Sequence, residues 1–301
     1  MSASGAHAGV RPLHVLMLVG VMFVWGMNFA VAKIALLHLP PILLVALRFA
    51  LVALVLLPFV KRPHGEWRGI LLVSVFLGLL HFSLMFNGIR HVDASTAAIA
   101  IQLQVPFSAL LAALVFKDKL GWRRAAGMAI AFAGVALIAG EPRLQGNYLS
   151  LAMVISAACI WAVAAIFIKR LENVDGFMLN AWMAVFATPQ LFAASFLLES
   201  GQIEAMVQAD WLVVGFALFY QAVIIVIIGY GTWYWMLQRY DVNQTMPFTL
   251  LVPLFGVLSG VLFLGEQLTL TFVIGGMITI VGVGIIILRR PRFAGPRTWR
   301  A

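Results

Sequence analysis

The chain has 301 residues, of which 63% are hydrophobic and only 10% are charged, whereas soluble domains carry about 25% charged residues. A water-exposed surface of this size could not hold so much apolar area, so the composition excludes a soluble domain and indicates an integral membrane protein. The formal net charge is +9, and the single cysteine, Cys159, excludes an internal disulfide and is interpreted as a packing residue.

Ten apolar runs follow one another along the chain. Most are close to the ~20 residues that an α-helix needs to cross about 30 Å of hydrocarbon. The sequence therefore predicts an all-α integral membrane protein with ten transmembrane helices, or spans, joined mostly by short loops. The runs cover residues 13–36, 40–60, 68–89, 94–116, 122–140, 147–168, 176–198, 211–237, 242–264 and 269–288.

The first run has a second interpretation as a signal peptide. Arg11 precedes it, and Ala30-Val31-Ala32 resembles a small-residue cleavage site. We prefer a transmembrane helix, because the run exceeds the roughly 7 to 15 residues of a usual signal core. The second half of the chain also keeps its own equivalent of this run.

Spans 2 and 3 carry one buried-looking basic residue each. Arg48 lies about eight residues into span 2, roughly 12 Å along a helix. Its guanidinium could snorkel to the interface or face a cavity and attract a carboxylate, and both interpretations stay open. His81 and Met85 share one face of span 3. The imidazole could face a cavity, where it could carry a proton, or it could bond a neighbouring backbone carbonyl.

Spans 4 and 9 carry prolines at matching positions, Pro106 and Pro253, which are 147 residues apart. Proline interrupts the helical hydrogen-bond ladder and leaves carbonyls free for a ligand, water or another helix. Paired interruptions indicate a binding site between two halves, with Gln102 and Thr249 nearby, and they predict hinges at both prolines. The alternative is a pair of kinks that serve only packing.

Span 6 repeats a motif of span 1. Trp25–Lys33 reads WGMNFAVAK and Trp161–Lys169 reads WAVAAIFIK, 136 positions later. Each half holds five spans, an odd number, so the two copies enter the membrane in opposite directions. The sequence therefore predicts two five-helix inverted-topology repeats, residues 1–140 and 141–301, within one membrane domain whose second repeat ends in a basic cytoplasmic tail.

Span 8 is rich in aromatic residues, including Tyr230 and Tyr234 one turn apart. Together with the tryptophans at positions 25, 161 and 182, these rings could sandwich a planar side chain and hold an ammonium by cation–π attraction. Packing remains an alternative for each ring, and Trp235 suits the interface belt. Spans 5 and 10 are lined instead with glycine and alanine, which indicates close helix packing within a monomer or at the contact of a homodimer.

Lys and Arg residues are distributed unevenly between the two sides. Cytoplasmic loops retain positive charge, and with the N-terminus inside, 16 of the 20 Lys and Arg are cytoplasmic. Three, Lys33, Arg90 and Arg143, lie outside. Both termini are therefore predicted to face the cytoplasm in a bacterial-type inner membrane, and contact with membrane lipid explains the charge without a nucleic-acid partner.

Several motifs carry a family resemblance over nearly the whole chain. They are W-G-x-N-F at Trp25–Phe29, Arg48-Phe49, Pro253 followed thirteen residues later by Glu266, and the glycine-rich last span of each half. On these residues the chain resembles the EamA-type transporters of the drug/metabolite transporter superfamily, and most of all their YddG-type aromatic amino acid exporters. The first half departs from the pattern, with Lys117-Asp118 where the family usually shows Gly-Glu.

The resemblance implies a secondary transporter that exports amino acids, most of all aromatic and other large neutral ones, by alternating access through a central cavity. Export of another small metabolite or of cationic drugs is the alternative, and uniport and proton antiport both stay open. The predicted substrate-binding residues are Trp25, Asn28, Arg48, His81, Met85, Gln102, Trp161, Trp182, Tyr230, Tyr234 and Thr249.

The remaining charged residues near the spans are interpreted as structural. We expect Lys33 and Lys169 to snorkel from their helix ends, with gating by ion pairs as the alternative. Asp118 and Glu266 precede spans 5 and 10, where a carboxylate offsets the positive helix N-terminus. The chain shows no nucleophile motif and no His or Cys grouping for a metal, so we expect no enzyme activity, cofactor or metal.

The charge distribution generates a first prediction. In a Cys159→Ser background, a cysteine placed in the Glu199–Asp210 loop should react with an impermeant thiol reagent on intact cells. A cysteine between Lys117 and Arg124 should react only after permeabilisation. Protection of the first position in intact cells would reverse the predicted orientation.

Overall fold

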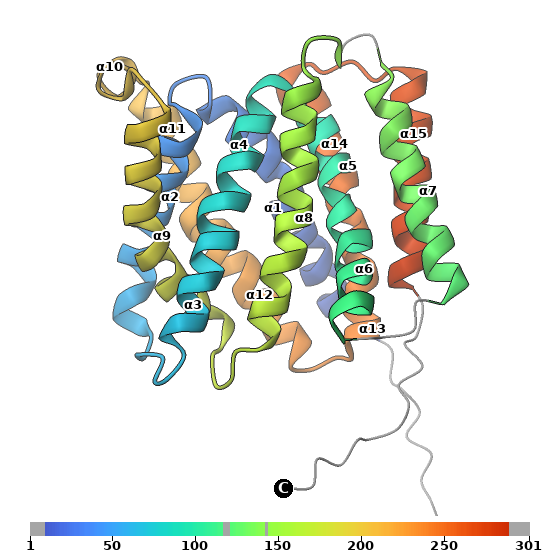
Figure 1. Cartoon of the computed structure of the whole chain (residues 1–301), viewed down its shortest axis with the longest axis horizontal. Coiled ribbons are helices and arrows are strands. Elements are labelled where there is room, and N and C mark those ends of the chain that lie inside the picture. The colour runs from blue at the N-terminus through green and yellow to red at the C-terminus, as the bar shows by residue number, and fades with distance from the viewer. Residues whose placement is uncertain (1–9, 117–120, 142–143, 289–301) are drawn as a thin grey trace, which may run out of the picture.

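The structure, a computed structural model, describes residues 10–116, 121–141 and 144–288, and these described residues form helices and turns without a strand. They contain ten helical spans that are long and apolar enough to cross a membrane. The spans stand side by side between two ends of the molecule (Figure 1). Their bounds differ from the predicted apolar runs by a few residues at most, so the predicted fold class is confirmed.

The first repeat contributes five spans. Pro12 and Pro41 begin the first two helices, where the missing N–H of proline costs no helical hydrogen bond. The spans are α1 (Pro12–Ala35), α2 (Pro41–Leu56), span 3 with α3 (Trp67–Val73) and α4 (Phe82–His91), span 4 with α5 (Ala94–Ala100) and α6 (Gln104–Phe116), and α7 (Trp122–Ala139).

The second repeat follows the same order. Asp175 caps the second of its spans by accepting from the Met178 N–H at 2.8 Å. A short helix, α10 (Gln202–Gln208), occupies the longer loop that follows it. The spans are α8 (Tyr148–Lys169), α9 (Gly176–Leu198), span 8 with α11 (Trp211–Phe219) and α12 (Gly231–Leu237), span 9 with α13 (Val242–Thr245) and α14 (Leu251–Leu264), and α15 (Leu270–Ile287).

Equivalent helices of the two repeats pack in a reciprocal manner. Helix α1 packs on α14, and its counterpart α8 packs on α6; α2 packs on α9, and α7 packs on α15. Glycine permits the closest approach between α1 and α14, because a Cβ at Gly26 would lie against the backbone of Val252 and Gly256. This reciprocity is the arrangement that an inverted repeat requires.

Helices α7 and α15 form a glycine-packed pair at one side of the molecule (Figure 1). A Cβ at Gly134 would meet Thr279 and the backbone of Gly275, and a Cβ at Gly282 would meet the backbone of Ala131. The small residues predicted to serve packing are therefore used inside the fold, between one helix from each repeat.

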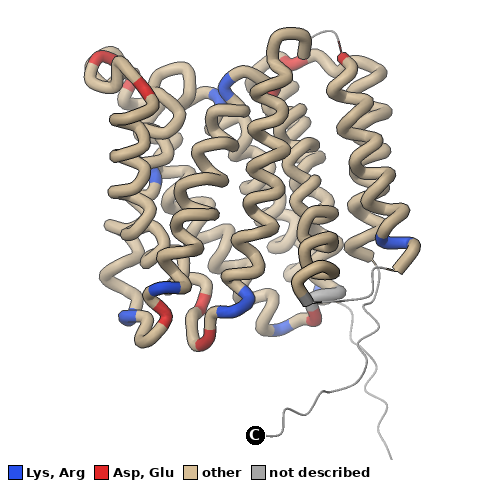
Figure 2. The backbone as a smooth tube through the Cα atoms, in the orientation of Figure 1, with Lys and Arg blue, Asp and Glu red and all other residues tan. Residues whose placement is uncertain are grey.

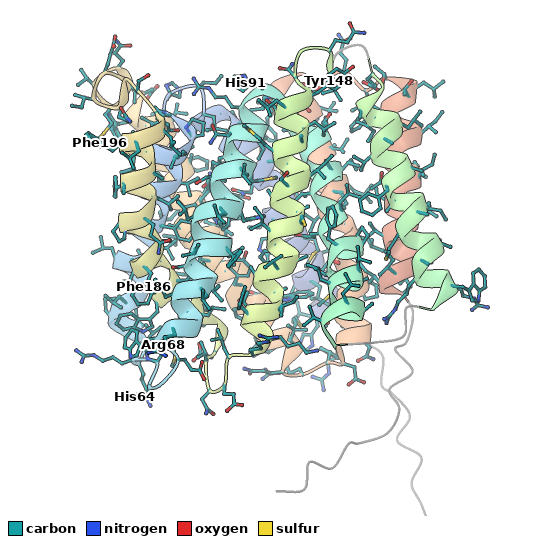
Figure 3. The ribbon with its side chains drawn as sticks, viewed as in Figure 1. His64, Arg68, His91, Tyr148, Phe186 and Phe196 are labelled. Atoms are coloured by element: carbon teal, nitrogen blue, oxygen red, sulfur yellow. The ribbon has the colours of Figure 1, made fainter. Side chains whose placement is uncertain are left out.

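Charged residues gather at the two ends of the molecule (Figure 2). His64 and Arg68 lie at one end, which we call the basic end, and His91 and Tyr148 lie at the other, which we call the opposite end (Figure 3). The basic end carries most of the described Lys and Arg. Asp118, Arg143 and the predicted basic tail lie outside the described residues.

Within the described residues, four spans depart from regular α-helix in their interior, in two matching pairs. Span 3 contains a π-helical segment, Ser74–His81, and span 8 contains another, Tyr220–Tyr230. Spans 4 and 9 contain 3₁₀ segments, Ile101–Leu103 and Met246–Leu250. The 3₁₀ segments precede Pro106 and Pro253, so the predicted interruptions are present, whereas no proline marks the π segments. Such departures are frequent at functional sites.

The glycine-packed pair generates a prediction about stability. Gly134→Ala places a methyl group where Thr279 and the backbone of Gly275 already lie. We expect a loss of about 1–3 kcal/mol, measured as a lower thermal unfolding temperature of the purified protein in detergent. Gly215→Ala in α11 is the matched control, because its Cβ meets no atom within 4 Å. Equal melting temperatures for the two variants would contradict the close packing.

Candidate functional site

Arg48 is buried in the middle of the helix bundle. It is 4% exposed, and its guanidinium carbon lies 4.5 Å from the centroid of the Phe82 ring and 5.7 Å from that of Phe49. Its Nε and Nη1 atoms are buried without a hydrogen-bond partner among the described residues. The structure therefore contradicts the snorkelling interpretation, since the side chain ends inside the protein rather than at the interface.

His81 lies at the end of the first π segment and is also buried. Its Nδ1 lies 2.8 Å from the carbonyl oxygen of Ala157 in α8. A carbonyl only accepts, so Nδ1 carries a proton, and in the neutral form of the ring Nε2 is an acceptor. The ring contacts Phe82 and Trp161, with centroids 4.8 and 5.8 Å away. The predicted bond to a backbone carbonyl is thus present, and the ring also borders the aromatic residues.

Tyr230 ends the second π segment and lies within a run of aromatic rings. Its ring centroid is 5.2 Å from that of Trp25 and 6.0 Å from that of Tyr234, which stacks on it at an interplanar angle of 15°. Trp25 also contacts Trp233 at 5.6 Å. The indole Nε1 of Trp25 is buried without a hydrogen-bond partner among the described residues.

Ring contacts, together with the electrostatic reach of Arg48, relate residues of both repeats in one cluster. The Arg48 guanidinium lies within electrostatic reach of both His81 and Tyr230. We call Trp25, Arg48, His81, Trp161 and Tyr230 the central group. His81 and Tyr230 come from equivalent spans, because they are 149 positions apart and the repeat spacing here is close to that value.

The depth of the central group follows from helix geometry. Trp25 lies ten residues before the end of α1, Arg48 seven residues into α2, and His81 ten residues before the end of α4. At 1.5 Å per residue these Cα positions lie about 10–15 Å from the opposite end. A hydrocarbon core about 30 Å thick has its midplane at this depth.

Two further polar side chains near this depth have unpaired buried atoms. Asn28 follows Trp25 by three residues on α1, on a neighbouring face, and its Oδ1 has no hydrogen-bond partner in the described structure. Gln221 is completely buried at the start of the second π segment, with both amide atoms unpaired. Sequence reasoning missed Gln221, although a lone amide inside an apolar span is a signal for a functional position.

The other predicted site residues are placed differently. Met85 and Gln102 are buried in spans 3 and 4. The Thr249 hydroxyl donates to the Met246 carbonyl of its own helix at 2.7 Å. The Trp182 indole donates to the Lys61 carbonyl at 2.9 Å and meets Trp67 edge-on at 4.8 Å, near the basic end. The structure therefore does not bring Trp182 to the central group.

Carboxylates at the opposite end cap helices of the other repeat. Glu266 accepts from the backbone N–H groups of Ala94 and Ser95 at 2.6 and 2.9 Å. It thus offsets the N-terminal charge of α5 and not that of α15, which Thr269 caps through the Phe272 N–H. The prediction that Glu266 offsets a helix N-terminus is confirmed, but the helix is α5 and not the predicted span 10, because tertiary packing sets which helix Glu266 meets.

Lys33 lies beside this cap. Its Nζ donates to the carbonyl of Val92, and Glu266 and Asp93 lie within electrostatic reach. Lys33 is therefore held by the protein instead of snorkelling, whereas Lys169 at the basic end is exposed. Within the described residues, no three His, Cys, Asp or Glu side chains group closely enough to hold a metal ion.

Comparison with known proteins finds one family twice in the chain. The profile of the EamA-like transporter family matches residues 12–140 and again residues 149–288. A solved structure titled "Crystal structure of protein" has the same fold, with a TM-score of 0.58 and 18% identity over 92% of this chain and 97% of that chain.

Relatives of similar length come from several bacteria. Proteins of Salmonella typhimurium and Escherichia coli, each named a probable amino-acid metabolite efflux pump, are 32% identical over 88% of this chain and 91% of their own. A probable terminal-alkyne amino-acid exporter of Streptantibioticus cattleyicolor is 26% identical, with 75% of each chain covered.

The unpaired guanidinium generates a prediction about the ligand-free protein. A buried charge without a partner is costly, so Arg48→Met should raise the free energy of unfolding by on the order of 1 kcal/mol or more. This gain is measured as a higher thermal unfolding temperature in detergent. Arg68→Met, which removes an exposed guanidinium at the basic end, should leave it nearly unchanged. A fall in melting temperature for Arg48→Met would mean that the guanidinium stabilises the empty protein.

Proposed function

Because the chain belongs to the EamA-like transporter family, whose profile matches both of its halves, we propose that it exports amino acids across the bacterial inner membrane. Its preferred substrates are aromatic and other large neutral amino acids, which bind at the central group and leave by alternating access. The basic end then faces the cytoplasm, and the opposite end faces outward. The names of the relatives support export of amino acids as a class.

The observation that carries the proposal is the buried, unpaired guanidinium of Arg48 among aromatic rings. A substrate carboxylate would supply the acceptor that Nε and Nη1 lack, in the paired geometry that guanidinium and carboxylate groups favour. The charge-assisted hydrogen bonds would form in a low-dielectric interior, where they are stronger than in water. An amino acid always presents that carboxylate, whatever its side chain.

The rings of Trp25, Trp161 and Tyr230 account for the preference among side chains. Trp161 of α8 contacts His81, and Trp25 of span 1 contacts Tyr230 of span 8. Arg48 lies within electrostatic reach of Tyr230. Aromatic faces bind a planar apolar side chain in offset or edge-on contacts. The ammonium group can meet the Oδ1 of Asn28, which is a buried acceptor, or an aromatic face.

A positive charge at the centre also argues against the alternative of cationic drugs. An organic cation without a carboxylate would meet Arg48 in a low-dielectric site with no compensating acidic residue in the spans around it. Acidic amino acids would bring a second negative charge that the central group does not match. A neutral zwitterion with an apolar side chain fits the charge and the aromatic surface together.

Alternating access draws on the paired departures from α-helix. Each π segment ends at a central-group residue, His81 or Tyr230, and each 3₁₀ segment precedes a proline, Pro106 or Pro253. Irregular backbone is where helices bend or change register. We propose that the two prolines are the hinges of the exchange between inward-open and outward-open states.

Counterflow of labelled amino acids in proteoliposomes tests the function directly. Phenylalanine or leucine trapped inside should drive uptake of labelled phenylalanine. Quaternary ammonium drugs should not drive it. Counterflow driven by the drugs but not by amino acids would reject the proposal.

Selectivity should depend on the aromatic rings. Tyr230→Ala and Trp161→Ala should each weaken competition by phenylalanine by about 0.5–1.5 kcal/mol, or roughly twofold to tenfold, and competition by alanine much less. Phe23→Ala is the matched control, because it removes an edge-on aromatic pair with Phe255 from an exposed face of α1. Equal losses for alanine and phenylalanine in the Tyr230 variant would contradict aromatic recognition.

A further inference from the structure

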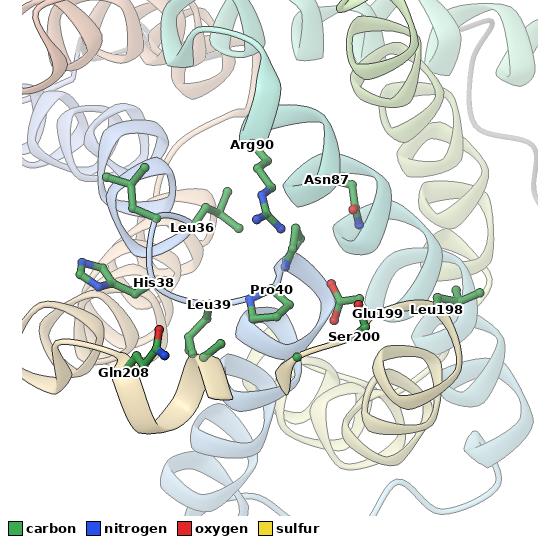
Figure 4. A pocket seen from close by; sticks show the side chains of 14 residues that line it. Leu36, His38, Leu39, Pro40, Asn87, Arg90, Leu198, Glu199, Ser200 and Gln208 are labelled. Carbon is green, nitrogen blue, oxygen red and sulfur yellow. The ribbon is translucent and has the colours of Figure 1, made fainter. Parts of the chain in front are cut away.

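A cavity of about 620 Å³ opens at the opposite end of the molecule, away from the central group. The turn between α1 and α2, the end of α4 and the segment from α9 to α10 form its walls (Figure 4). Arg90 and Asn87 extend from α4 toward it, across from Pro40 and Glu199. Its volume lies within the range of about 300–1,000 Å³ that is typical of small-molecule sites.

The two charged walls of the cavity differ in what they can offer a ligand. Both oxygens of Glu199 are occupied, because they accept from the N–H groups of Ile42 and Leu43 at 2.7 and 3.0 Å, and the Ser195 hydroxyl donates to one of them at 2.7 Å. The N-terminus of α2 carries about half a positive charge, which compensates this carboxylate. Glu199 is therefore committed to the fold.

Arg90 has no such commitment. Its side chain is exposed, and the described structure gives it no hydrogen bond and no ion pair. The amide nitrogen of Asn87, which also lines the cavity, donates to the Ser83 carbonyl at 2.8 Å. Leu37 and Leu198 are the exposed apolar side chains of its lining. Among the described residues that line it, the cavity thus offers the unpaired guanidinium of Arg90, neutral polar groups and two exposed leucines.

The cavity lies between the central group and the opposite end, on the same helices. Helix α2 starts at the cavity wall with Pro41 and reaches Arg48 seven residues, or about 10 Å, deeper. Span 3 carries His81 nine residues, or about 13 Å, before Arg90. Helices α2 and α4 pack against each other, so a buried and an exposed guanidinium follow one another along this helix pair.

We propose that the cavity is a second binding site for the carboxylate of the exported solute, with Arg90 as its anchor. A solute that leaves Arg48 toward the opposite end would exchange one guanidinium for another before it enters bulk water. The identity of the ligand rests on the proposed function, whereas the presence of a carboxylate site does not. The exposed side chains of Leu37 and Leu198 would contact the side chain of the same solute.

Protection from thiol labelling tests the site without any transport. In the full-length purified protein with Cys159→Ser, a reporter cysteine replaces Gln208, which lines the cavity and is exposed. Phenylalanine and phenylacetate should slow its modification, and phenethylamine, which has no carboxylate, should not. Arg90→Gln should weaken protection by roughly tenfold, as expected for loss of a charge-assisted pair. A His64→Cys reporter at the basic end should show no protection.

Arg68→Gln, which removes an exposed guanidinium from the basic end, is the control. In this variant the ligands should protect the reporter cysteine as well as they do in the parent protein. Protection that survives in the Arg90 variant, or that phenethylamine gives equally, would overturn the carboxylate site even if counterflow works. Conversely, protection that depends on Arg90 in a protein without amino-acid counterflow would support the site and overturn the proposed function. The two proposals therefore fail separately.

Discussion

Every backbone N–H and C=O that enters hydrocarbon must find its partner inside the protein, because no water is there to replace it. This constraint explains why all ten spans are helical, and it also explains where the carboxylates of the opposite end are used. Glu199 satisfies the first N–H groups of α2, and Glu266 satisfies those of α5, in each case from the other repeat. Helix ends thereby become contacts between the repeats.

The same constraint makes Arg48 informative. A buried charge without a counter-ion is unfavourable for an empty protein, and a well-packed apolar residue would serve the fold at least as well. The ring of Phe82 lowers the free-energy cost of burying the Arg48 guanidinium but does not remove it, since two of its nitrogens remain unpaired. A buried, unpaired charge is retained where it serves function, even though it lowers the stability of the fold.

The sequence was sufficient for the spans, their order and the repeat, because hydropathy and the recurrence of tryptophan and proline are local signals. It identified Trp25, Arg48, His81, Trp161 and Tyr230 as candidates, and the folded chain brings these five into ring contact or within electrostatic reach of one another. It could not predict the π segments, since no residue type marks them. It also could not predict the pairing of Glu266 with α5, because the residues that meet are 172 and 171 positions apart in the chain. The position of Trp182 outside the central group could not be predicted for the same reason, because its neighbours Lys61 and Trp67 are distant in sequence.

The reciprocal packing of α2 on α9 limits how a protein built from two repeats can evolve. At the repeat spacing of 136, the position on α9 that corresponds to Arg48 is Ala184, with Met183 and Val185 beside it, so the second copy carries no charge there. Two identical five-helix chains would have to place one guanidinium on each of these packed helices, and the two like charges would repel each other in a medium of low dielectric. Fusion of the copies into one chain allows a single cation to be kept and its twin to be discarded. The asymmetry of one side chain is thus a property that one fused chain can acquire and a pair of identical chains cannot.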